Sequence, residues 1–374
     1  MKRTLANFLT AAITVAILVA LNAGMNYVEA NSRFHAGYAI RVLMLALINV
    51  IAAVSLNLVN GFTGQFSLGH AVFFGIGAYA GAAFTVFAQK PLFGHILSSS
   101  DVVSWSHGGI VLLAAMLVGG LAAALAGFIV GLPSLKLRGD YLAIVTLGFN
   151  FIVVVVINSL DVIGGAAGFT GTSRGDTPVN IPALTSFFWV ALVAITVIVL
   201  SINLRRSVHG LAFESIREDE IAAEAMGIPT TRYKVTAFVL AAFLAGVAGA
   251  MYVHYNGSVA TPSLDFTASV NIVVMVVLGG LGSVSGSVVG AIILTVLPEA
   301  LRNISPDADK YRLVVYSVLL IILMLLRPQG IFGRDEIGAV WFRKQINGTV
   351  TLPRRSLTWL TNVLQRRQRR GGSA

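Results

Sequence analysis

Long apolar segments, separated by short polar connections, constrain this chain more than any other feature of its sequence. Helices that cross a bilayer need about 20 mostly apolar residues. Ten stretches approach this pattern, at about residues 5–24, 41–59, 66–87, 109–131, 141–160, 186–204, 233–254, 267–281, 285–299 and 311–326. The eighth and ninth are short and lie close together, so they are either half-helices or one broken element. We therefore expect an all-α polytopic membrane protein with about 8–10 transmembrane helices.

The composition agrees with this class and argues against an enzyme. Of the 374 residues, 56% are hydrophobic and 11% are charged, whereas roughly a quarter are charged in an average soluble protein. The absence of cysteine excludes disulfides, thiolate nucleophiles and cysteine-ligated metals. No lysine follows a glycine, which excludes a phosphate-binding GxxxxGK[ST] loop, and the motif HExxH is also absent. We expect no catalytic residue, no metal site and no cofactor bound by this chain.

The distribution of basic residues predicts the orientation. With a cytoplasmic N-terminus and ten crossings, 19 of the 26 Lys and Arg residues lie inside and seven outside. Both termini and residues 205–234 are then cytoplasmic, and the net charge of +10 reflects membrane orientation rather than nucleic-acid binding. The segment 5–24 has features of a signal peptide, but its cleavage site is weak, so we interpret it as a helix.

Residues 205–234 form the one long, heavily charged segment between apolar stretches. Five basic and five acidic side chains require this segment to lie in water. Its middle, residues 215–226, has helical composition and is followed by the stop signal Gly227-Ile228-Pro229. A short helix outside the bundle offers a surface on which a partner can act. The alternative is a solvated helix stabilised only by its own ion pairs.

Glycines mark close contacts and turns. Small-xxx-small spacing, which lets helix backbones approach closely, occurs at Gly77 and Gly81, at Gly127 and Gly131, and at Gly282, Gly286 and Gly290. The glycine-rich run 60–71 leads directly into a span, and it is either a tight cytoplasmic hairpin or part of the transport path. The candidate path or gate residues are Asn57, Gly61, Gly64, Gln65, Ser67, His70, Gly279, Gly280 and Gly282.

Five sequence strings, in this order, carry a family resemblance. They are NGFTGQFSLGHAVFFGIGAYAG, LKLRGDYLAIVTLGF, FESIREDEIAAEAMGIPTTRYKVTAF, VVLGGLGSVSGSVVGA and LLRPQGIFG, and they lie between about residues 41 and 333. Each string is weak alone, but together they closely resemble permease subunits of branched-chain amino acid ABC importers (the Liv family), of the larger M-type.

The resemblance implies a type II ABC importer-like fold and a set of partners. A second homologous permease, two cytoplasmic ABC ATPases that use ATP, and a periplasmic substrate-binding protein are expected, together with membrane lipid and without nucleic acid. The location is the bacterial inner membrane. From the composition, residues 1–333 are predicted to form the permease domain and residues 334–374 a basic cytoplasmic tail that is either a membrane-surface helix or disordered. The ATPase-coupling residues carried over are Arg217, Glu218, Asp219, Glu220, Ala222, Ala223, Glu224, Ala225 and Gly227.

The predicted substrate is leucine, isoleucine, valine or a related apolar amino acid. An ABC permease for urea or an amide-like solute is the alternative within the same class. A stand-alone secondary transporter is a weaker alternative, because the predicted spans contain no pair of carboxylates. A membrane scaffold is disfavoured by the broken, glycine-rich spans.

Overall fold

The structure is a computed structural model that describes residues 18–24, 35–93, 107–134, 141–174, 177–304, 318, 321 and 330–333. Its longer helices are α2 (His35–Asn57), α3 (His70–Phe93), α5 (His107–Ser134), α6 (Tyr141–Asn158), α7 (Phe187–Arg205), α8 (Val208–Glu218), α10 (Thr230–Asn256), α11 (Phe266–Gly279) and α12 (Val284–Ile304). The shorter elements are the π-helix Leu58–Phe62, the 3-10 turns Asp161–Ile163, Gly165–Ala167 and Thr261–Leu264, helix α9 (Glu220–Ala225), and strands β1 (Gly171–Arg174) and β2 (Thr177–Asn180).

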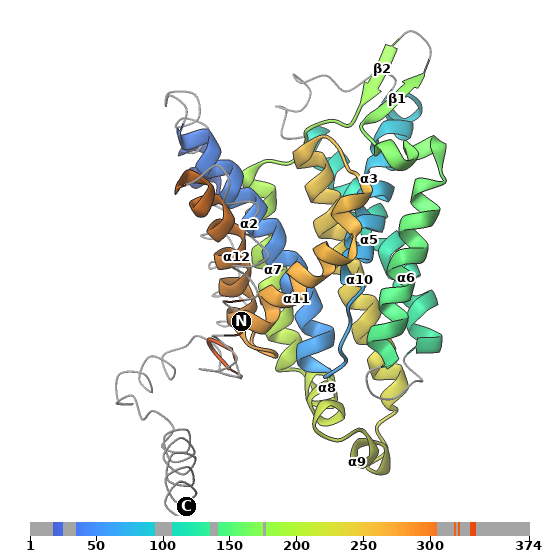
Figure 1. Ribbon diagram of the computed structural model, residues 1–374, viewed down its shortest axis with the longest axis vertical. Coiled ribbons are helices and arrows are strands. Elements are labelled where there is room, and N and C mark those ends of the chain that lie inside the picture. The colour runs from blue at the N-terminus through green and yellow to red at the C-terminus, as the bar shows by residue number, and fades with distance from the viewer. Residues whose placement is uncertain are drawn as a thin grey trace, which may run out of the picture. The chain divides into compact units, whose positions relative to one another are not determined.

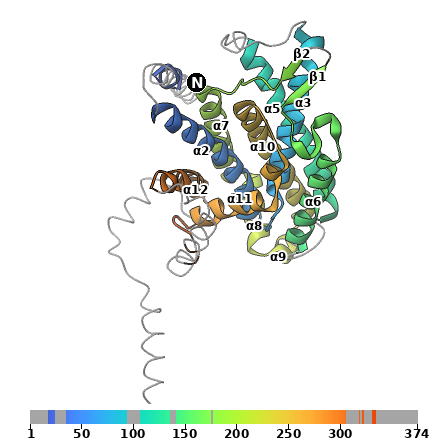
Figure 2. The same ribbon diagram turned by 45° about the horizontal axis from the view of Figure 1, so that its top comes forward.

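Helix α10 is the centre of the bundle. It packs against α5, α3 and α2, while α2 also contacts α7, α11 and α12 (Figures 1 and 2). Helix α6 lies at the side of the bundle against α3 and α5. The predicted all-α polytopic fold is confirmed, with one addition: β1 and β2 form a short antiparallel hairpin in the connection after α6.

Glycines bring three of these helices into backbone contact. A Cβ atom at Gly77 of α3 would lie 2.2 Å from the carbonyl oxygen of Gly246 on α10. A Cβ atom at Gly246 would in turn lie 2.6 Å from the carbonyl oxygen of Gly119 on α5. A side chain at either position would collide with backbone, so these residues allow helices to approach without a hydrophobic driving force. The packing role predicted for Gly77 is confirmed.

Six described helices are long and apolar enough to cross a membrane, at residues 37–62, 70–88, 108–134, 141–158, 187–205 and 230–256. Helices α11 and α12 provide two shorter apolar segments. Large apolar side chains on α5 and α6, such as Leu121 at 62% and Ile144 at 66% exposure, point outward, as lipid-facing residues do. Most residues of the predicted spans 5–24 and 311–326 lie outside the described residues.

The eighth and ninth apolar stretches form two helices with a glycine break between them. Helix α11 has 14 residues, about 21 Å at 1.5 Å per residue, which is shorter than the hydrocarbon core of a bilayer. The chain then turns at Gly280 and Gly282, whose φ angles of 114° and 93° favour glycine. These segments are therefore separate, with α11 as a half-helix.

The single helix predicted over 215–226 is wrong, because the segment forms two helices. Asp219 separates α8 from α9 in an extended conformation with φ −158° and ψ 110°. Its carboxylate oxygen Oδ1 accepts hydrogen bonds from the backbone N–H groups of Ile221 and Ala222, at 2.9 and 3.0 Å. Asp219 is thus an N-cap that begins a new helix, whereas helical composition alone does not reveal the break.

The predicted stop signal after the charged segment is confirmed. The N–H of Gly227 donates to the carbonyl of Glu224 at 2.9 Å, and the N–H of Ile228 donates to that of Ala223 at 3.1 Å. Gly227 has a φ of +85°. This is the hydrogen-bond pattern of a Schellman motif, with glycine at the left-handed position.

The chain divides into two units, residues 1–334 and 335–374. All the described residues belong to the first unit. The basic tail predicted over 334–374 lies outside the described residues.

Candidate functional site

Two breaks in the helices meet inside the protein. Helix α2 ends in the π-helix Leu58–Phe62, and α11 ends before the turn that leads to α12. Buried Asn57 joins them: its amide oxygen accepts from the N–H of Gly282 at 2.8 Å, and its Nδ2 donates to the carbonyl of Ser283 at 3.1 Å. One side chain therefore pairs with backbone groups at the α11–α12 turn.

Arg217 of α8 connects the charged segment to these breaks. Its Nη1 donates a hydrogen bond to the carbonyl oxygen of Gly61 in the π-helix. A Cβ atom at Gly64 would lie 2.9 Å from Cγ of Arg217, and one at Gly282 would lie 2.6 Å from Nη1. The two glycines thus leave the space that this long side chain occupies. We call Asn57, Gly61, Arg217, Gly282 and Ser283 the junction.

Polar contacts hold the charged segment against the bundle. The carboxylate of Glu220 forms an ion pair with the buried Lys234 of α10, at 2.5 Å. Thr230 donates to Glu224 at 2.7 Å, at the start of the same helix. Because these bonds join α9 to the beginning of α10, the segment is held at two points, by Arg217 near its middle and by α10 at its end.

The residues predicted to contact an ATPase have different surroundings. Glu218, Asp219, Glu224, Ala225 and Gly227 are exposed, as is Ala222, whereas Ala223 is 4% exposed and contacts this chain's own bundle. Large exposed apolar side chains lie beside these residues but were not among the predicted ones, such as Ile221 at 66% and Met226 at 82% exposure. The sequence itself indicates both residues, because they are apolar side chains in a charged segment that must lie in water.

The structure brings only some of the predicted path residues together. Asn57, Gly61 and Gly282 belong to the junction, and Gly64 contacts Arg217 in it. Gly279 and Gly280 end α11, and a Cβ atom at Gly279 would lie 2.1 Å from the carbonyl oxygen of Gly286, so close helix packing explains Gly279.

The remaining three predicted path residues lie outside the junction. His70 is buried and its Nε2 lies 2.7 Å from the Oγ of Ser55. The N–H of Ser67 donates to Asn60 at 3.1 Å, and that of Gln65 donates to the carbonyl of Val59 at 3.2 Å. These contacts stabilise the turn between α2 and α3, as the hairpin interpretation of residues 60–71 predicts.

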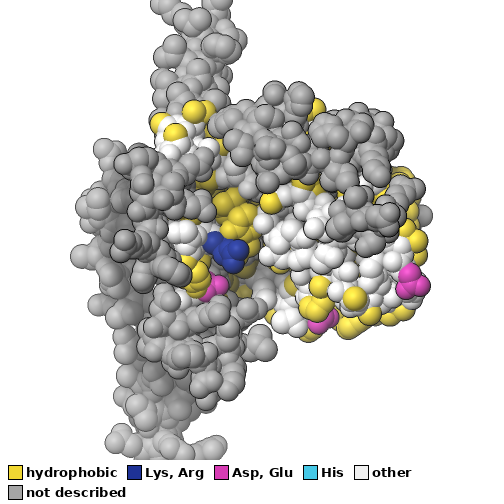
Figure 3. Space-filling view, turned by 90° about the horizontal axis from the view of Figure 1, so that it is seen from above, with side chains coloured by type: hydrophobic (Ala, Val, Ile, Leu, Met, Phe, Trp, Pro, Cys, Tyr) yellow, Lys and Arg dark blue, Asp and Glu magenta, His cyan; other side chains and the backbone are white. Residues whose placement is uncertain are grey.

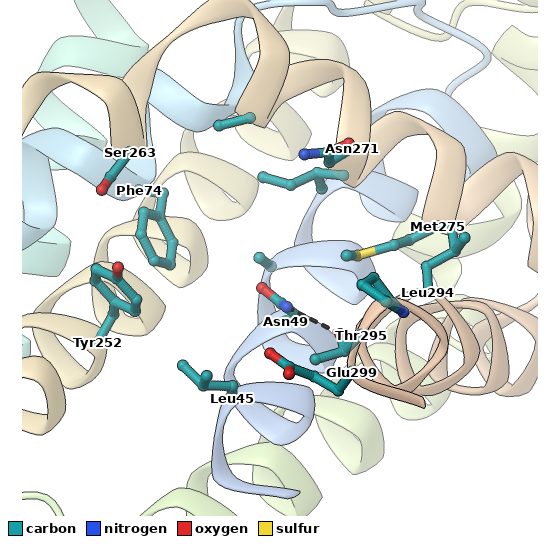
Figure 4. A pocket seen from close by; sticks show the side chains of 14 residues that line it. Leu45, Asn49, Phe74, Tyr252, Ser263, Asn271, Met275, Leu294, Thr295 and Glu299 are labelled. Atoms are coloured by element: carbon teal, nitrogen blue, oxygen red, sulfur yellow. Dashed lines mark hydrogen bonds between the residues drawn. The ribbon is translucent and has the colours of Figure 1, made fainter. Parts of the chain in front are cut away.

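A cavity of about 270 Å³ lies between α2, α3, α10, α11 and α12 (Figure 4). Its wall includes Asn49, Asn271, Thr295 and Glu299 among the polar residues. Asn49 donates from Nδ2 to Oγ1 of Thr295 at 2.9 Å, which joins α2 to α12 a second time. Asn49 precedes Asn57 by eight residues, or about 12 Å along the helix axis, so α2 connects the cavity to the junction, and α12 begins directly after Ser283 of the junction.

These cavity residues are not among the site residues predicted from the sequence. Asn271 and Glu299 stand out as polar residues in apolar stretches, and Asn49 does so too. The sequence does not show that the five helices carrying these residues surround one cavity.

Comparison with known proteins agrees with this architecture. Residues 38–324 match the family described as the permease component of branched-chain amino acid transport systems. The chain is 34% identical over 316 residues to the high-affinity branched-chain amino acid transport system permease protein LivM of Escherichia coli, covering 78% of this chain and 69% of that protein. It is also 26% identical over 341 residues to a probable LivM of Methanocaldococcus jannaschii, covering 79% and 93%.

A second permease type is similar to part of the chain. The LivH permease of Escherichia coli is 34% identical over 161 residues, which is 43% of this chain and 51% of that protein. No solved structure matches the chain.

Proposed function

The chain belongs to the family of permease components of branched-chain amino acid transport systems, and from this we propose that it is the membrane-spanning permease subunit of an ATP-driven importer for leucine, isoleucine, valine or related apolar amino acids. The observation that carries the proposal is the junction. A charged segment predicted to be cytoplasmic is joined there, through Arg217, to the breaks of α2 and α11–α12. A partner that moves this segment thereby acts on helices of the transport path.

We propose that the moving partner is a pair of cytoplasmic ABC ATPases. The exposed surface of α8–α9 has apolar side chains, Ile221 and Met226, among the carboxylates of Glu218, Asp219 and Glu224. Apolar anchors surrounded by charges are typical of protein interfaces, where the centre is desolvated and the rim stays polar. Ala223 is buried within the chain and takes no part in this surface.

ATPase closure would act through the anchored segment. The Glu220–Lys234 ion pair connects α9 to α10, and Arg217 connects α8 to the π-helix. A displacement of the segment therefore changes the position of α2 relative to α11 and α12 at the junction. Because packed helices move between discrete arrangements rather than deforming continuously, such a displacement can open or close the path.

The other proposed partners follow from the family and the orientation. A second, homologous permease completes the path, since the chain resembles both LivM and part of LivH. With both termini cytoplasmic, the connection that carries the β1–β2 hairpin faces the opposite side of the inner membrane. An extracytoplasmic binding protein would deliver the substrate on that side.

Uptake by purified components tests the proposal. The chain, its sister permease and the ATPases are reconstituted in vesicles with the binding protein outside, and labelled leucine and urea are supplied in turn. We expect leucine uptake that requires ATP and persists when ion gradients are dissipated. Uptake of urea but not leucine would identify the alternative importer, and gradient-driven uptake without ATPases would identify a secondary transporter.

A further inference from the structure

We propose that the cavity between α2, α3, α10, α11 and α12 binds one apolar amino acid in its zwitterionic form, with the substrate's ammonium group at the carboxylate of Glu299. This inference rests on the proposed function and adds a substrate site within this chain. It assigns recognition of the amino group to a residue of this chain, in addition to any selection by a binding protein.

Glu299 is the residue that points to a charged ligand. Among the eight apolar helices in the described part of the chain, it is the one acidic residue. Glu299 ends the apolar segment Val284–Glu299 and is partly buried. An ionisable side chain on a membrane helix is costly and marks substrate or ion pathways. Here the hydroxyl of Tyr38 donates to Oε2 of Glu299 and fixes the carboxylate in the cavity wall. A fixed carboxylate in the wall of a partly open cavity favours a cation such as a primary ammonium.

Polar and apolar groups line the same cavity. Asn49 and Thr295, bonded to each other, lie beside Glu299 (Figure 4). The apolar wall includes Phe74, Ile272 and Met275. An apolar amino acid is divided in the same way as this cavity wall, because it has a charged end and an aliphatic side chain. The volume of about 270 Å³ lies just below the range of roughly 300–1,000 Å³ of drug-sized sites and suits a smaller solute.

A positive charge, that of Arg41, lies on the face of α2 that also carries the cavity residues Leu45 and Asn49. Arg41 precedes Leu45 and Asn49 by four and eight residues on α2, so the three lie on one face, and Arg41 is exposed. From above, basic and acidic side chains lie close together in a hollow bordered by apolar surface (Figure 3). Because an α-amino acid carries both charged groups on one carbon, the substrate carboxylate would lie beside the ammonium group and point toward Arg41. A neutral amide or urea would gain neither ionic contact.

The test uses cysteine labelling, which is clean because the chain has no native cysteine. Ala268→Cys places a thiol in the cavity wall, and Ala166→Cys places one at an exposed position on the turn after α6. Both variants are assembled with the partner subunits and treated with a small maleimide while binding protein delivers leucine or urea. We expect leucine to slow labelling in Ala268→Cys only, and urea to have no effect.

Glu299 is then tested in the Ala268→Cys background. Glu299→Gln keeps the shape but removes the charge, and should raise the leucine concentration needed for protection by about tenfold or more, the loss expected for a hydrogen bond to a charged group. Glu299→Asp keeps the charge and should retain protection. This pair separates loss of the carboxylate from a general folding defect.

Each failure has a distinct meaning. If the wild-type complex takes up leucine but leucine does not slow labelling in Ala268→Cys, the cavity is not the site. Equal protection with Glu299→Gln and with the parent overturns the role of the carboxylate. A wild-type complex that does not take up leucine contradicts the proposed function itself and the inference with it, and this is read from uptake before any labelling.

Discussion

Arg217 donates a hydrogen bond to the carbonyl oxygen of Gly61, a residue 156 positions earlier in the chain. The bond joins the charged segment between α7 and α10 to the π-helix at the end of α2. Gly64 and Gly282 leave room for the arginine side chain, so the contact depends on the absence of two side chains as well as on the presence of one.

Removing this arginine should uncouple ATP hydrolysis from transport. Arg217→Ala loses the bond to Gly61 and the side chain that fills the space beside Gly64. We expect leucine transported per ATP hydrolysed to fall by about tenfold, as for a lost charged hydrogen bond, while the complex still assembles and hydrolyses ATP. Arg206→Ala removes an exposed arginine from the same segment and should leave this ratio unchanged. Equal ratios for the two variants would contradict the role of Arg217.

The second prediction concerns the close contact of α11 and α12. A Cβ atom at Gly286 would lie 2.4 Å from the carbonyl oxygen of Gly279, so Gly286→Leu forces the helices apart. Overpacking of this kind costs about 1–3 kcal/mol or more, and we expect a lower Tm and reduced uptake. Gly148→Leu is the matched control, because Gly148 is an exposed helical glycine whose Cβ would meet nothing within 4 Å. Similar Tm values for both variants would show that the glycine contact is dispensable.

Substitutions of Gly227, after the end of α9, should distinguish loss of ATPase docking from loss of local folding. A Cβ atom at Gly227 would meet nothing within 4 Å of this chain, but its φ is +85°. Gly227→Arg adds a bulky charge to the proposed ATPase surface, and we expect normal protein levels, no co-purifying ATPase and no uptake. Gly227→Asn tolerates the left-handed conformation and adds no charge, so it should retain the ATPase. Retained ATP-dependent uptake by Gly227→Arg would remove the support for docking at this surface.

The orientation of the chain in the membrane can be measured by labelling single introduced cysteines. Met226 is 82% exposed on the charged segment and Val162 is 70% exposed in the connection after α6. The excess of basic residues predicts that these positions lie on opposite sides of the membrane. A membrane-impermeant maleimide should label Val162→Cys in intact cells, and Met226→Cys only after permeabilisation. The reverse pattern would invert the topology.

The sequence alone determined the class of the protein and the position of its main segments. Runs of about 20 apolar residues must bury their backbone polar groups within helices, so the spans from residue 41 to residue 299 could be located without coordinates. The charged segment 205–234 and the glycine break near Gly282 were visible for the same reason, since charges and unpaired backbone are costly in lipid. The family was also recognisable from short motifs, and the comparison with known permeases confirmed it.

Tertiary structure decided what those segments do together. The split between α8 and α9 depends on one extended residue, Asp219, whose capping bonds do not follow from composition. The pairing of Asn57 with Ser283 spans 226 positions, and the cavity takes its wall from five helices. Hydropathy predicts which segments lie in lipid and which lie in water, but it does not predict which face of a helix packs against which neighbouring helix. Those faces are chosen by close packing of small residues and by pairing of buried polar groups, and both exist only once the helices have assembled.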